Sequence, residues 1–428
     1  MHSGGPVREG KHKTVPQGSG TNQHTDGQGL GEPPAAACPR RRALLAFRHV
    51  RVLLDYRPAL RDRSGVGEYV HELAGALAAT APPDHRLELF TSSWKDRPHP
   101  QLAAEAPGVA VHDRRVPVRV LNWWWHRAGV PRIERLVRGP FDVVHAAHPL
   151  LIPTVGARVV TIHDLDFLDH PERTGAEVRR DYSSLVQKHA TRADGLLTSS
   201  EHSAQRIVEA LSIPREHVVV APPGPPRWTA GGRRTPRNPL GYVLFVGTLE
   251  PRKNLGALLD AYTLLRAQEA DIPPLKVAGR APSSAAPWLR RMKEPPLAGS
   301  VDYVGYVPDA DRRALFEGAS LLVLPSWHEG FGLPVLEAMA LGVPVVTSNR
   351  GALPEVAGDA GLLVAPDDPG AMADAIRRLL RQDRLAEACV RLGLGRAAML
   401  SWSQSAHAVW GLYADAVRRH LRRRAHRR

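Results

Sequence analysis

The stretch SLLVLPSWHEGFGLPVLEAMALGVPVVTS, residues 320–348, decides the fold. It opens with the apolar run SLLVLPS, which predicts a buried strand. Pro334 suits the first turn of a helix and Gly342 suits a helix C-terminal cap, so a helix is expected over 334–341. The apolar run VPVVTS (343–348) then predicts a second strand. A strand, a helix and a strand in this order form the unit from which parallel sheets are built.

The same alternation extends from this stretch over most of the chain. It is interrupted once, by residues 222–239, which are dense in Pro, Gly and Arg and show no periodicity. The runs that predict strands are 49–58, 86–92, 141–148, 157–165, 193–200 and 217–224 before this interruption, and 241–247, 275–279, 301–307, 320–326, 343–348 and 360–366 after it. The sequence therefore predicts an α/β protein with two doubly wound, Rossmann-like domains.

The expected division of the chain follows from this alternation. The parts are a disordered extension (1–46), an N-terminal domain (47–222), a linker (223–239), a C-terminal domain (240–402), a helix returning to the first domain (403–417) and a basic tail (418–428). In open parallel sheets, ligands bind outside the carboxyl ends of the strands. A binding site is therefore expected in a cleft between the two domains.

The charge distribution and the cysteine content exclude some classes of function for this chain. The chain of 428 residues carries a formal net charge of +14, of which +5 lies in residues 1–51 and +7 in residues 418–428. The remaining body is nearly neutral, so no nucleic-acid partner is expected. Two cysteines cannot form a disulfide framework, which favours a reducing, cytoplasmic location. No apolar run reaches the roughly 20 residues of a membrane span, and the first 35 residues lack a secretory signal.

Two glutamates mark the central stretch as a candidate site. Glu329 lies in the loop after a predicted strand, between His328 and Gly330. The glycines in this loop allow a ligand to approach the backbone closely. Glu337, eight positions on, is expected in the first turn of the helix, where a carboxylate is also favoured by the helix dipole alone. A structural role therefore remains open for Glu337, whereas Glu329 has no such explanation.

This pattern resembles the signature of retaining GT-B glycosyltransferases of family four. The resemblance covers roughly residues 49–416 and includes YVLFVGTLEPRKNLGALLDAY (242–262), VGYVPDADRRALFEGASLLVLPS (304–326) and TIHDLDFLDHPE (161–172). It implies the GT-B fold, a nucleotide-diphosphate sugar bound mainly by the second domain, an acceptor bound by the first, and metal-independent transfer without a cofactor. The overall pattern is most similar to bacterial surface-polysaccharide mannosyltransferases, which suggests GDP-mannose, or otherwise a UDP-sugar, as donor.

The resemblance also assigns roles to individual residues. The residues it implicates are Glu329 and His163 in catalysis, Gly330, Phe331 and Gly332 in binding the donor sugar, Glu337 in binding the ribose, Arg252, Lys253, Gly65 and Gly67 in binding the diphosphate, and Asp164 in binding the acceptor. Arg252 and Lys253 could also be a solvated basic pair, although cations at a helix start are unfavourable unless an anion lies there. In some relatives a further arginine occupies the position of Thr248.

Several alternatives stay open. Asp164 and Asp166 have a spacing used to hold Mg²⁺ or Mn²⁺, but Asp309 and Asp311 share it, so no metal site is predicted. His163 could be structural. The tail Arg418–Arg428 could bind an anionic membrane surface or be solvated. A two-carboxylate glycoside hydrolase, a GT-B-shaped sugar-nucleotide epimerase and a non-catalytic adaptor are the competing functions, with a glycan, a lipid-linked sugar or a small molecule as acceptor for a transferase.

Overall fold

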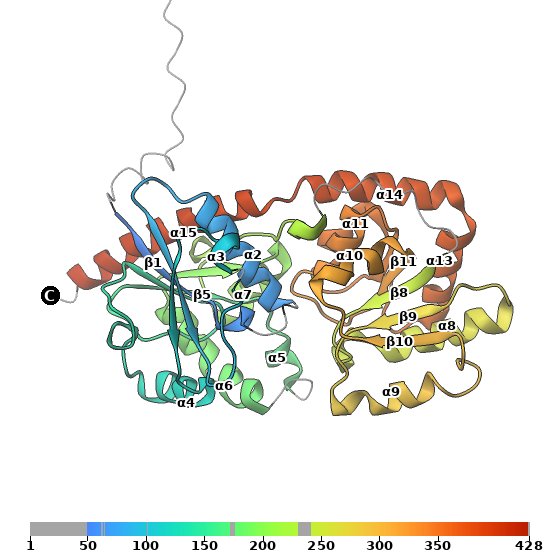
Figure 1. The fold of residues 1–428 in the computed structure, drawn as a ribbon, viewed down its shortest axis with the longest axis horizontal. Coiled ribbons are helices and arrows are strands. Elements are labelled where there is room, and N and C mark those ends of the chain that lie inside the picture. The colour runs from blue at the N-terminus through green and yellow to red at the C-terminus, as the bar shows by residue number, and fades with distance from the viewer. Residues whose placement is uncertain are drawn as a thin grey trace, which may run out of the picture.

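Two parallel sheets, one from each half of the chain, form the framework of the protein (Figure 1). The computed structural model describes residues 49–426 except 61, 62, 64, 101, 172–175 and 230–240. The predicted disordered extension and most of the predicted linker lie outside the described residues. None of the described helices combines the length and apolar character needed to cross a membrane.

The first sheet has seven strands in the order β3-β2-β1-β4-β5-β6-β7, and every pair is parallel. Its strands are β1 (Arg51–Asp55), β2 (Arg86–Ser92), β3 (Ala110–Arg114), β4 (Val143–Ala146), β5 (Ala157–Thr161), β6 (Gly195–Thr198) and β7 (Val218–Val220). Its helices are α2 (Val66–Ala79), α3 (Leu102–Glu105), α4 (Val118–Trp123), α5 (Asp166–Asp169), α6 (Ala176–Arg192) and α7 (Glu201–Leu211). The crossover helices bury the two faces of the sheet in separate apolar clusters.

The second sheet has six strands in the order β10-β9-β8-β11-β12-β13, again all parallel. Its strands are β8 (Tyr242–Val246), β9 (Leu275–Ala278), β10 (Val301–Gly305), β11 (Ala319–Leu324), β12 (Val345–Ser348) and β13 (Gly361–Val364). Its helices are α8 (Leu255–Gln268), α9 (Ala286–Arg291), α10 (Asp309–Glu317), α11 (Leu333–Ala340), α12 (Leu353–Ala357), α13 (Pro369–Arg381) and α14 (Asp383–Ala398). The predicted α/β class with two doubly wound sheets is confirmed.

The sequence analysis missed β3. This strand is at the edge of the first sheet, and none of its five side chains is fully buried. An edge strand with exposed faces does not need the apolar run by which the other strands were identified. Among the described strands it pairs with β2 alone, from Glu88–Ala110 to Ser92–Arg114.

The stretch that decides the fold forms the β11–α11–β12 unit. Gly332 has a φ of 101° immediately before α11, and Pro334 lies within its first turn. After the helix, Gly342 has a φ of 71°, and the Val343 N–H donates to the Ala338 carbonyl. The expected helix start and glycine cap are confirmed. Glu337 is the exception, because the first turn of α11 contains no acidic residue.

The final helix, α15 (Trp402–Ala425), leaves the second domain and packs on the first, against α2, β5, β6 and β7 (Figure 1). Trp410 and Tyr413 are buried in the cluster on one face of the first sheet. The Tyr413 hydroxyl lies 2.8 Å from His145 Nδ1. The last element of the described chain is therefore part of the core of the first domain.

The arginines at the end of α15 are only partly available to other molecules. The sequence placed a separate basic tail from Arg418, whereas the helix continues to Ala425. Arg419 donates to the backbone carbonyl of Asp194 at 2.5 Å, and Arg423 lies 3.3 Å from the buried Asp194 carboxylate. Two of the arginines thus tie the helix to the first domain. The membrane contact through Arg418–Arg428 stays a prediction.

A line of polar contacts joins the two domains beside the cleft. The hydroxyls of Ser199, Ser200 and Ser203 donate to the Gly330 carbonyl at 3.2, 2.7 and 3.3 Å. Glu355 of α12 accepts hydrogen bonds from the backbone N–H groups of Glu201 and His202, at 2.9 and 3.0 Å. A carboxylate of the second domain therefore caps the first turn of a helix in the first domain, where the helix dipole favours it.

Glu355→Ala is expected to weaken this contact between the domains. Loss of a capping carboxylate costs about 1 kcal/mol, so the thermal midpoint should fall and small-angle X-ray scattering should report a wider distribution of shapes. Glu201→Ala is the matched control, because its exposed carboxylate pairs with Arg215 within the first domain. If both variants have the same midpoint and the same scattering, the cap does not hold the domains together.

Candidate active site

A cavity of about 320 Å³ lies between the domains, at the carboxyl ends of their strands. The first domain contributes the start of α2 and the loop after β5, and the second contributes the loops after β8 and β11. The predicted site residues on its wall are Gly65, His163, Asp164, Arg252, Lys253, Glu329, Gly330, Phe331 and Gly332. Gly67 and Glu337 are not on this wall. The structure thus gathers residues from four separate segments of the chain into one cavity.

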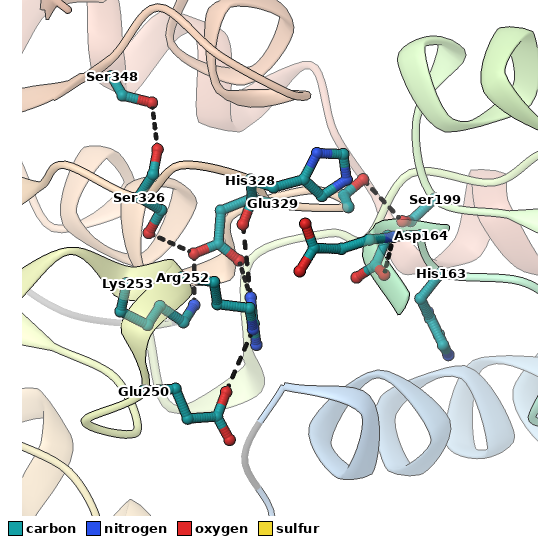
Figure 2. Close-up of polar contacts among 12 residues, drawn as sticks. His163, Asp164, Ser199, Glu250, Arg252, Lys253, Ser326, His328, Glu329 and Ser348 are labelled. Atoms are coloured by element: carbon teal, nitrogen blue, oxygen red, sulfur yellow. Dashed lines mark hydrogen bonds and ion pairs between the residues drawn. The ribbon is translucent and has the colours of Figure 1, made fainter. Parts of the chain in front are cut away.

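Glu329 is the centre of the charged cluster in this cavity (Figure 2). Its carboxylate forms an ion pair with the Lys253 ammonium and lies 3.3 Å from an Arg252 guanidinium nitrogen. Ser326 donates to it at 2.6 Å. Arg252 and Lys253 come from the short turn Pro251–Lys253 that precedes α8. The anion that balances two cations at a helix start is therefore the Glu329 carboxylate.

The charges of this cluster shift the protonation of its members. Burial would raise the pKa of Glu329, but the charges of Lys253 and Arg252, with hydrogen bonds from Lys253 and Ser326, lower it to about 2. Burial lowers the pKa of Lys253, an effect that the Glu329 charge opposes. Glu329 is therefore ionised at every physiological pH, and it can only accept hydrogen bonds there. The structure also adds Ser326 and Glu250, which the sequence analysis did not single out; Glu250 lies 3.2 Å from Arg252.

His163 lies on the opposite wall of the cavity. Its ring meets that of Tyr69 edge to face, with centroids 5.0 Å apart, and points away from Glu329 in Figure 2. Burial lowers its pKa to about 4, so the ring is neutral at pH 7. The buried Nε2 has no hydrogen-bond partner among the described residues. A neutral imidazole with one unpaired nitrogen at a cavity wall is suited to a hydrogen bond with a ligand.

Glu337 lies behind the cavity wall. Its side chain is fully buried, and one carboxylate oxygen accepts a hydrogen bond from the Arg312 guanidinium at 2.5 Å. Arg312 lines the cavity, lies over the Trp228 ring at 5.4 Å, and contacts Asp309 at 3.4 Å. The sequence analysis missed Arg312, because an arginine on a polar helix carries no signal of a buried partner. Arg312 is therefore the cavity-lining partner of Glu337, whose second carboxylate oxygen has no hydrogen-bond partner among the described residues.

The glycines of the cavity differ in what they do. Gly65 has a φ of 55° and open space where a Cβ would lie, so it permits a backbone turn at the start of α2. Gly67 is buried within α2. At Gly330 a Cβ would lie 2.3 Å from the His163 carbonyl oxygen, which makes Gly330 a point of close contact between the domains.

The Asp164 and Asp166 pair shows no arrangement typical of a metal site. Asp164 lines the cavity, and its carboxylate accepts a hydrogen bond from the Asp166 N–H at 3.2 Å. Among the described residues, no group of three or more His, Cys, Asp and Glu side chains is placed to hold a metal ion. The pair instead fixes the turn between β5 and α5.

Comparison with known proteins decides the family. The model of glycosyltransferase family 4 matches residues 63–225, and that of the glycosyl transferases group 1 matches residues 241–382. The O-antigen chain mannosyltransferase B of Escherichia coli is 30% identical over 377 residues, which are 82% of this chain and 96% of that protein. The chain belongs to glycosyltransferase family 4. The resemblance inferred from the Glu329 stretch is thereby confirmed.

The family 4 glycosyltransferase is also similar to proteins whose names state other activities. The D-inositol 3-phosphate glycosyltransferase of Mycolicibacterium smegmatis is 30% identical over 418 residues, covering 89% of this chain and 92% of that protein. Among solved structures, a sucrose-phosphate synthase from Thermosynechococcus elongatus superposes with a TM-score of 0.66 at 20% identity, over 85% of this chain and 98% of that one. The GT-B fold of the glycosyltransferase is confirmed by this likeness.

Proposed function

We propose that this glycosyltransferase transfers a hexose, with mannose the best candidate, from a nucleotide-diphosphate sugar to an acceptor hydroxyl with retention of configuration. The observation that carries the proposal is the Glu329 cluster in the cavity between the domains. There a carboxylate that stays ionised lies between two cations from a helix start. A site of this kind supplies both charges that the departure of a diphosphate from a sugar requires.

The two cations would stabilise the leaving group. As the bond between the anomeric carbon and the diphosphate breaks, negative charge builds on the phosphate oxygens. Arg252 and Lys253 lie on the cavity wall in the same short turn and can follow these oxygens with charge-assisted hydrogen bonds. We propose that this arrangement does the work that a metal ion does in other transferases, so that no metal or cofactor is required.

The carboxylate would act on the sugar itself. Glu329 can accept hydrogen bonds from donor-sugar hydroxyls and stabilise the positive charge that develops at the anomeric carbon. The backbone of Gly330, Phe331 and Gly332 continues this wall of the cavity. His163, on the other wall, offers its unpaired Nε2 close to the transferred sugar. The acceptor oxygen would then bond to the anomeric carbon on the face that the diphosphate leaves, replacing the bond to the diphosphate, and its proton would pass to the departing phosphate oxygen.

Glu337 requires a rearrangement before it can bind the ribose. Its carboxylate pairs with Arg312 and is fully buried. Arg312 also lies near Asp309 and can turn toward that residue when a nucleotide enters. The ribose role of Glu337 is therefore proposed only for the nucleotide-bound state.

The names of the relatives support mannose and leave several acceptors open. One relative is named for O-antigen chain mannosyl transfer and another for D-inositol 3-phosphate. We propose GDP-mannose as donor, with UDP-sugars as the second choice, and a glycan, lipid-linked sugar or small polyol as acceptor. The reaction would take place in the cytoplasm, with or without contact to an anionic membrane.

A donor screen tests this proposal directly. Thermal shifts are measured with GDP, UDP and ADP and with their sugars, and we expect the largest rise with GDP-mannose. Proton NMR of the product should show the same anomeric configuration as the donor, and activity should survive EDTA. Conversion of the nucleotide sugar without any acceptor would support an epimerase. A failure of every nucleotide sugar to bind would overturn the proposal.

A further inference from the structure

A second cavity of about 520 Å³ adjoins the first, on the side of the first domain. It lies at the carboxyl ends of β1, β4 and β5, and it shares His163, Asp164 and Arg252 with the first cavity. A ligand here would therefore lie next to the proposed sugar-transfer site. Its volume is within the range of ordinary ligand pockets, roughly 300–1,000 Å³.

The charged groups of this second cavity are predominantly acidic. Its described lining contains the carboxylates Asp55, Asp164, Asp166 and Glu250 and the guanidiniums Arg57 and Arg252. Carboxylates thus outnumber guanidiniums among these residues. Such a wall attracts hydroxyl donors and repels anions.

Neither guanidinium is left for an acceptor phosphate, because Arg57 is paired within the first domain and Arg252 is the proposed partner of the donor diphosphate. Arg57 lies 2.7 Å from an Asp55 carboxylate oxygen, donates to Asn122 at 2.9 Å, and lies over the Trp125 ring at 5.0 Å. Its side chain is only 6% exposed. Burial would raise the pKa of Asp55, but Arg57 and His148 hold that pKa well below its usual range. The Asp55 carboxylate and the Arg57 guanidinium therefore both stay charged. Arg252 contacts Glu250 and Glu329 and is the proposed partner of the donor diphosphate.

One buried polar atom on this wall, Oδ2 of Asp166, has no partner among the described residues. Asp166 is only 4% exposed, whereas the unpaired Nε2 of His163 is already assigned to the transferred sugar. An unsatisfied buried polar atom is costly, so its presence at a cavity indicates a missing ligand group. A carboxylate oxygen needs a donor, and a hydroxyl provides one, whereas an ionised phosphate cannot.

Aromatic rings complete the second cavity. The rings of His148 and Tyr182 stack with centroids 6.3 Å apart at an interplanar angle of 20°, and Phe167 meets Tyr182 edge to face. All three residues line the cavity. A sugar ring presents both hydroxyls for the carboxylates and C–H faces for such rings.

We propose that the second cavity binds the acceptor as an uncharged sugar or similar polyol, and that it discriminates against phosphorylated acceptors. Asp166 is the specificity-determining residue, because its unpaired oxygen accepts from an acceptor hydroxyl. This inference rests on the proposed function and narrows its acceptor class. It places the enzyme among those that extend neutral glycans rather than those that glycosylate a sugar or polyol phosphate.

Matched pairs of acceptors test the charge preference. The pairs are methyl α-mannoside with mannose 6-phosphate, and myo-inositol with inositol 3-phosphate. Saturation-transfer NMR reports their binding without any turnover, and transfer assays with the active donor report their use. We expect the neutral member of each pair to bind and react at least about tenfold better. Equal use, or preference for the phosphorylated member, would overturn the inference.

Two matched variants test the role of Asp166. Asp166→Asn should raise the KM for the neutral acceptor about tenfold, because the hydrogen bond from the acceptor hydroxyl loses its charged partner, and it should leave the KM for the donor unchanged. Asp169→Asn is the control, since this carboxylate on the same short helix pairs with Arg206 instead. If the two variants behave alike, Asp166 does not contact the acceptor.

The outcomes separate this inference from the proposed function. One outcome is that the donor binds and is slowly hydrolysed while phosphorylated acceptors are preferred. This outcome would overturn the proposed acceptor class alone. Donor that is neither bound nor consumed would overturn the proposed function and the inference with it.

Discussion

Glu329→Gln is expected to reduce sugar transfer by about 10²–10³-fold while GDP-mannose still binds. The variant keeps the shape of the side chain but removes the negative charge that we propose acts on the anomeric carbon. Loss of one preorganised electrostatic contact to a transition state has an effect of this size. The loss should appear in kcat rather than in the KM for the donor, because the positive charge at the sugar develops only as the bond breaks. Steady-state kinetics with the donor identified by the screen measure this effect.

Stability must be separated from catalysis in this variant. Glu329→Gln leaves the Lys253 ammonium buried without its counter-charge, and breaking one side of a buried pair costs about 3–5 kcal/mol. A lower thermal midpoint is therefore expected. The double variant Glu329→Gln, Lys253→Met removes both charges and should recover most of the midpoint without recovering activity. Glu317→Gln is the matched control, because its pair with Arg313 is outside the cavity. Wild-type turnover in Glu329→Gln would remove Glu329 from the mechanism.

Gly330→Ala is expected to reduce transfer at least tenfold through the contact between the domains. The new Cβ would lie 2.3 Å from the His163 carbonyl oxygen and 2.9 Å from its carbon. Real Cβ atoms do not approach a backbone so closely, so either the loop after β11 or the segment carrying His163 and Asp164 must move. Both walls of the cavity would then be displaced relative to each other, which misplaces the reacting groups.

The expected signature of Gly330→Ala is a split between binding and turnover. Nucleotide binding, measured by calorimetry with GDP, should change little, because the second domain is proposed to hold most of the donor. The turnover number should fall, and the KM for the acceptor should rise. Gly395→Ala is the control, since a Cβ at this position of α14 has nothing within 4 Å and should stabilise the helix slightly. Unchanged kinetics in Gly330→Ala would mean that the two walls tolerate relative movement.

Much of the fold could be predicted because buried strands have continuous apolar sequences. The runs at 86–92 and 320–326 coincide with β2 and nearly with β11, and the expected helix at 334–341 nearly matches α11. Edge strand β3 escaped detection because its side chains are partly solvated. The end of α15 was misplaced for a related reason. A run of arginines suggests solvent, yet Asp194, more than 200 positions earlier, holds two of them.

The candidate site was predicted where its residues follow one another in the sequence. The Glu329 loop and the Arg252-Lys253 turn are local patterns, and the structure brings them into contact, whereas their roles in transfer stay predictions. Contacts between distant segments were not predictable in this way. Arg312 meets Glu337 across two helices, Gly330 meets His163 across the domain boundary, and the second cavity combines residues from 55 to 252. These long-range contacts depend on how the two sheets are placed relative to each other. Local sequence periodicity carries no information about that placement.

The return of α15 to the first domain bears on how the protein is made. Domains of a nascent chain generally fold one after another, starting from the N-terminus. The first sheet, however, lacks the cover over β5, β6 and β7 until residues 402–425 have left the ribosome. Until then the apolar surface that receives Trp410 and Tyr413 stays exposed to water and to chaperones. The second domain can therefore complete its core during synthesis before the first does, although it is translated later.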